Sequence, residues 1–146
     1  MMDFSTGMRV SASGLTAQRQ RMNTISSNIA NINTTRTPEG GPYRRKDIVF
    51  EAMPDARNFG EILTSAPDLK TQRVQVTDVL VDRKAPLLKY EPDHPDANED
   101  GYVAYPNINL MEEMTNMIQA TRSYEANVSA MQATKDMAMS ALEIGR

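Results

Sequence analysis

The chain has 146 residues, the length of one domain, and its net charge of −3 gives no reason to expect a nucleic acid or an anionic membrane as its partner. It contains no cysteine, which excludes disulfides, thiolate metal sites and cysteine nucleophiles. The N-terminus lacks the basic start and apolar core of a Sec signal, and no apolar run approaches the roughly 18 residues of a membrane span.

The prolines divide the chain into three parts. All eight lie between residues 38 and 106. Proline interrupts helices because it lacks an N–H donor and clashes with the preceding turn. We therefore expect an N-terminal helix within residues 1–35, a loop-rich region over 36–106 and a C-terminal helix within 107–146.

A heptad pattern predicts a helix over residues 4–33. Apolar side chains recur every seven positions and on the neighbouring stripe: Met8, Leu15, Met22 and Ile29, with Ile25 and Ile32 beside them. The segment 22–35 carries no charge, and its amides and hydroxyls include Ser27, Asn28 and Asn31. Uncharged polar groups of this kind indicate a tightly packed polar contact in which each group is matched.

The middle region predicts short strands at 47–53, 73–82, 87–90 and 102–105, which would form a small β-rich lobe. The basic cluster at 43–46 is interpreted as a solvated strand start or as a contact with an acidic neighbour. The turn from Asp96 to Gly101 resembles the start of a calcium loop, but Asn107 stands where such a loop needs a bidentate glutamate. We expect an acidic turn there, and no metal site at His94, the only histidine.

The last segment predicts a long helix over 110–144. Its stripe follows alternating steps of four and three residues and includes Leu110, Met114, Met117, Tyr124 and Leu142. Asn109 and Glu112 resemble an N-cap and its partner. The fold expected is mainly α, with the two terminal helices in a coiled-coil-like antiparallel pair and residue numbers summing to about 146. The pair would lie within one chain or between two chains.

Several segments resemble bacterial flagellar rod and hook proteins. Residues 12–15 (ASGL) and 26–35 (SSNIANINTT) are similar to the N-terminal signature of that family, and 113–118 (EMTNMI) with 122–127 (RSYEAN) are similar to its C-terminal signature. Most members continue with a Thr-x-Gly-aromatic turn, whereas this chain has RTPEGGPYRRK at 36–46. That variant, with HPD at 94–96 and DGYVAYPN at 100–107, resembles the proximal-rod members.

The resemblance implies a structural subunit of the flagellar driveshaft that is not an enzyme and needs no cofactor. It implies a periplasmic position in the basal body, export by the flagellar type III apparatus without a cleavable Sec signal, and assembly with copies of itself and other rod proteins. The alternatives are another rod or hook axial protein and, in a different class, a small calcium-binding module built on Asp96–Gly101. The residues expected at subunit interfaces are Met8, Leu15, Met22, Ile25, Asn28, Ile29, Asn31 and Ile32 in the first helix and Met114, Met117, Thr121, Tyr124, Asn127, Val128, Met131 and Leu142 in the second.

Overall fold

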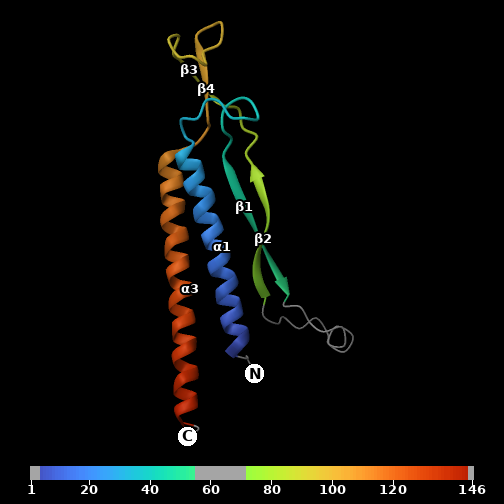
Figure 1. Cartoon of the computed structure of the whole chain (residues 1–146), viewed down its shortest axis with the longest axis vertical. Coiled ribbons are helices and arrows are strands. Elements are labelled where there is room, and N and C mark those ends of the chain that lie inside the picture. Colours follow the sequence, from blue (N-terminus) through green and yellow to red (C-terminus); the bar gives the residue numbers. More distant parts are fainter. Residues whose placement is uncertain (1–3, 55–71, 145–146) are drawn as a thin grey trace, which may run out of the picture.

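Two long helices and a β-hairpin lie side by side in the computed structural model, which describes residues 4–54 and 72–144 (Figure 1). The elements in chain order are α1 (Phe4–Ala30), β1 (Lys46–Pro54), β2 (Gln72–Val81), β3 (Leu87–Tyr90), β4 (Tyr102–Tyr105) and α3 (Leu110–Ile144). The helices, of 27 and 35 residues, make up about half of the described chain. The fold is therefore less dominated by helix than expected.

The helices α1 and α3 run antiparallel within one chain (Figure 1). Their contacts repeat every seven residues: Gly7 faces Thr134, Gly14 faces Asn127, and Asn28 binds Glu113. These pairs sum to 141, and Met22 meets Thr121, with 3.7 Å between the sulfur and the hydroxyl oxygen. The register therefore lies about one helical turn from the expected sum of 146, which had paired Met22 with Tyr124.

The seam between the helices is built from small and polar residues, which the apolar pattern did not reveal. Ala17 and Ala120, one on each helix, are buried. A Cβ on Gly14 would lie 3.1 Å from the side-chain amide of Asn127, so the backbones approach closely there. Met117, Tyr124 and other apolar residues of the predicted stripe are half-buried beside this seam. The stripe was wrong at Leu110, Met114 and Leu142, which are exposed.

The hairpin of β1 and β2 lies along α1 on the side away from α3 (Figure 1). The strands pair antiparallel from Lys46↔Val81 to Pro54↔Gln72, with a bulge between Val49 and Phe50. The backbone N–H of Val74 donates to the Ser13 hydroxyl at 3.2 Å and joins β2 to α1. The four predicted strands are confirmed to within one residue at each end, but the longest pair lies beside the helix rather than in a separate lobe.

The second sheet, β3 paired with β4, projects beyond the end of the helix pair (Figure 1). Tyr90 and Tyr102 pack edge to face across it, with ring centroids 5.3 Å apart. Gly101 closes the connecting turn with φ +80, and a Cβ there would lie 2.9 Å from the Tyr90 ring. Both the backbone angle and the close ring therefore require glycine at this position.

The apolar core is small. Among the described residues, the buried hydrophobic side chains are Ala17, Ile25, Val103, Ile108 and Ala120. No described helix is both long enough and apolar enough to cross a membrane. The N-cap of α3 forms as expected, because the side-chain oxygen of Asn109 accepts the backbone N–H of Met111 at 3.0 Å. Polar contacts must therefore hold much of this fold in place.

The two helical glycines of α1 provide a matched test of the close approach. Alanine is favoured over glycine in a helix by about 1 kcal/mol. Gly7→Ala should raise the free energy of unfolding by roughly that amount, because its methyl would meet only Thr134 at 3.9 Å. Gly14→Ala should gain less or lose stability, because Asn127 occupies the space. Urea unfolding of both variants measures the difference, and equal stabilisation would show that the seam is not tightly packed.

Candidate functional site

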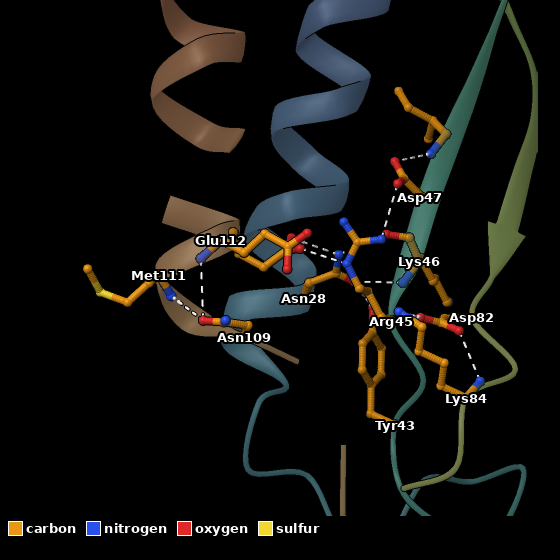
Figure 2. Close-up of polar contacts among 12 residues, drawn as sticks. Asn28, Tyr43, Arg45, Lys46, Asp47, Asp82, Lys84, Asn109, Met111 and Glu112 are labelled. Carbon is orange, nitrogen blue, oxygen red and sulfur yellow. Dashed lines mark hydrogen bonds and ion pairs between the residues drawn. The ribbon is translucent and has the colours of Figure 1, made fainter. Parts of the chain in front are cut away.

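A buried polar junction joins α1, β1 and α3 near the C-terminal end of α1 (Figure 2). At its centre is Asn28, which is only 1% exposed. Its side-chain amide pairs with the backbone of Lys46 in both directions, accepting from the N–H at 2.9 Å and donating to the carbonyl at 2.8 Å. The Asn28 side chain therefore pairs with the start of β1 as a neighbouring strand would.

The remaining hydrogen-bonding capacity of Asn28 reaches two further residues. Its nitrogen donates to the Glu113 carboxylate at 3.0 Å, and its oxygen accepts the Tyr43 hydroxyl at 3.1 Å. An amide has two donor hydrogens and two acceptor positions, and all four are used. Residue 28 thus contacts α3 and both ends of the 43–46 segment at once.

Glu113, also 1% exposed, is the buried charge of the junction. Its second carboxylate oxygen accepts from Arg45 Nε at 2.7 Å, and another Arg45 nitrogen binds Asp47 at 3.1 Å. Burial opposes the charge of Arg45, but the hydrogen bonds and ion pairs with Glu113 and Asp47 outweigh it and raise the pKa of Arg45. The guanidinium is therefore firmly cationic and compensates the buried carboxylate.

The sequence indicated part of this junction. The uncharged stripe predicted a matched polar contact, and Asn28 makes one, although inside its own chain. The basic cluster was interpreted as a solvated strand start or a contact with an acidic neighbour, and Arg45 makes the acidic contact. Glu113 was read only as a first-turn acid of the helix. Its spacing of 85 residues from Asn28 left no local signal for the contact.

The acidic turn at 96–101 uses its oxygen atoms to close its own loop. The side-chain oxygen of Asn98 accepts the backbone N–H groups of Asp100 at 3.1 Å and Tyr102 at 2.7 Å. Asp96 accepts the Thr35 hydroxyl at 2.8 Å, which joins the turn to the end of the N-terminal segment. Within 4–54 and 72–144, no three acidic or histidine side chains gather as a metal site would require. Nothing in this geometry favours the calcium-binding alternative.

Comparison with known proteins agrees with the terminal segments. The family model of the flagella basal body rod protein matches residues 8–36, and that of the flagellar basal body rod FlgEFG protein C-terminal matches 99–144. The chain is 44% identical to the flagellar basal-body rod protein FlgC of Borreliella burgdorferi, with 98% of each chain covered. It is 45% identical to that of Bacillus subtilis, with 95% of this chain and 96% of the relative covered. The chain belongs to the flagellar basal-body rod protein family.

This rod protein is a structural subunit of the flagellar basal body and not an enzyme. The similarity extends to more distant bacteria: 35% identity to FlgC of Salmonella typhimurium, over 94% of both chains. The two matched ranges contain Asn28 and Glu113, whereas Arg45 lies between them. The junction thus joins the two family segments through a residue of the intervening region.

The residues expected at subunit interfaces fall into two groups in this rod protein. Most of them are half-buried or buried in the single chain, Ile25 and Asn28 most deeply. Asn31 binds the Ser27 carbonyl of its own helix at 2.8 Å. Met114 and Leu142 are 48% and 73% exposed and remain accessible to a neighbour. Which of these residues contact another subunit stays a prediction.

We expect Asn28→Asp to destabilise the rod protein strongly. The change turns the donor nitrogen into an oxygen that faces the Lys46 carbonyl and the Glu113 carboxylate. Breaking a buried ionic network costs on the order of 3 kcal/mol or more. Asn31→Asp is the matched control, since that nitrogen has one backbone partner and lies half-exposed. Urea unfolding should show a much larger loss for Asn28→Asp, and the loss should shrink at acidic pH as one of the facing carboxyls is protonated. Similar small losses in both variants would contradict the assigned role of Asn28.

A second test concerns Glu91 in the small sheet. Hydrogen bonds from Lys89 and then Tyr105 lower the pKa of Glu91. The stabilisation from this carboxylate is complete above the ordinary glutamate pKa and is lost as pH falls through the lowered value. NMR titration of the Glu91 carboxyl should show a higher pKa in Lys89→Met than in wild type, and a smaller rise in Tyr105→Phe. Lys84→Met serves as control, and an unchanged titration in Lys89→Met would be the contrary result.

Proposed function

We propose that the chain is a subunit of the proximal part of the flagellar rod. It would be exported by the flagellar type III apparatus, assemble in the periplasm with copies of itself and other rod proteins, and transmit torque. The observation that carries this proposal is the 44–45% identity to two proteins named FlgC over nearly the whole chain. The resemblance of residues 94–96 and 100–107 to proximal-rod members supports the same position in the rod.

We further propose that α1 and α3 form a coiled coil. The support comes from their antiparallel course and from contacts that repeat every seven residues, from Gly7–Thr134 to Asn28–Glu113. The close seam would let the two helices act as one rod about 52 Å long, the length of 35 helical residues. Such a unit suits the transmission of torque, because packed helices bend and slide little.

The buried junction would serve this mechanical role by preventing α1 from sliding along α3. Asn28 and Glu113 meet at one end of the pair, and Arg45 connects both to the hairpin. A sliding motion would separate a buried carboxylate from its partners, which is strongly unfavourable. The hairpin would therefore keep a fixed position on the helix pair under load.

The assembled basal body provides the test. Cells lacking the gene should not swim and should lack a complete rod, and expression of the full-length chain should restore both. Cryo-electron microscopy of the restored basal bodies should show the antiparallel helix pair and its hairpin in the proximal rod. With the type III apparatus inactivated, the chain should stay in the cytoplasm. Complete rods in cells without the gene would refute the proposal.

A further inference from the structure

The exposed large hydrophobic side chains of this chain lie on its two outer layers. Within the described residues, none of them belongs to α1, the layer between α3 and the hairpin. They occur instead on the strands and on α3, with exposures from 37% for Val74 to 73% for Leu142. The middle layer is thus covered on two sides by its own chain, and the outer layers carry unpartnered apolar surface on opposite sides.

Two of these surfaces lie at the same level along the molecule. We call Leu110, Met111, Met114 and Ile118 the α3 shoulder, and Val79, Leu80 and Val81 the hairpin root. Val81 pairs with Lys46 beside Arg45, and Arg45 binds Glu113 within the shoulder region. The junction therefore fixes both surfaces at one height, on opposite sides of α1 (Figure 1).

Both surfaces are open enough to receive another molecule. In the shoulder, Met111 is 71% and Ile118 55% exposed, and in the root the three residues are 47–53% exposed. Successive strand residues point to opposite faces of a sheet, so neither face of the root is covered by the described chain. Contiguous exposed apolar surface of this kind marks an interaction site.

We propose that the α3 shoulder of one copy packs against the hairpin root of a second copy. The inference rests on the proposed function and names one of its contacts. Charge favours this pairing: residues 110–121 contain Glu112, which is exposed, and no basic residue. At the root, Asp47 and Asp82 are engaged by Arg45 and Lys84. An excess of one positive charge is left there, from Lys46 and Arg83 against Asp78.

The contact is heterologous, because it joins two different surfaces. Each copy presents its shoulder to one neighbour and its root to another, so the contact repeats from copy to copy and either closes a ring or continues as a helix. A symmetric contact of two shoulders would place one Glu112 near another. Since the two surfaces have the same height, neighbouring copies lie side by side rather than end to end.

Cysteine cross-linking tests this pairing in the assembled rod, since the natural chain has no cysteine. Cells lacking the natural gene would produce full-length Met114→Cys and Leu80→Cys variants together, and their basal bodies would be treated with a short bismaleimide. We expect a covalent dimer from the mixture and none from cells that produce either variant alone. Asn23→Cys, at an exposed position on α1, replaces Met114→Cys as the control and should give no dimer.

A second pair, Ile118→Cys with Val79→Cys, covers the case in which a variant of the first pair fails to restore swimming. Dimers from single-variant cells would mean a symmetric contact and would overturn the proposal. Swimming cells that give no dimer with either pair, or a cross-link only to a different rod protein, would also overturn it while leaving the proposed function intact. Absence of the natural chain from basal bodies would instead refute the proposed function itself.

Discussion

The buried network of Asn28, Glu113 and Arg45 is the interaction on which the arrangement of the layers depends. A carboxylate that is 1% exposed tolerates burial only while the amide and the guanidinium are in place. Removing one partner from such a network typically costs about 3–5 kcal/mol, a large part of the 5–15 kcal/mol that stabilises an ordinary domain. With so few buried apolar side chains, this chain has little else to fix α1, α3 and the hairpin relative to one another.

Close packing of small residues complements this polar junction. Gly14 allows the helix backbones to approach where Asn127 fills the seam, and Ala17 and Ala120 are buried nearby. Small side chains let helices pack tightly but bury little apolar area, so the large apolar residues of α3 remain on its outer face. This division is consistent with a subunit whose helices are held together internally and whose outer surfaces await neighbours in the rod.

Much of the fold was predictable because it depends on local patterns. The positions of the prolines gave the three-part division, and the two helices begin and end within about three residues of the predicted bounds. The alternation around Val74 and Val76 and the turn residues indicated strands within one residue of those found. The helix register was less predictable. Sequence periodicity identified an apolar stripe, but the contacts follow glycine, asparagine and threonine, whose small size and hydrogen bonds carry no hydrophobic signal.

The sequence by itself determined the family, the two long helices, the four described strands and the uncharged polar character of the segment around Asn28. Each of these follows from motifs, from local periodicity or from a helix-breaking residue type. Only the tertiary structure decided that the helices pair within one chain, that the hairpin lies along α1 and that Glu113 is buried against Arg45. Those contacts join residues 68 and 85 positions apart. Their partners are chosen by the packing of whole elements, which a local sequence pattern does not encode.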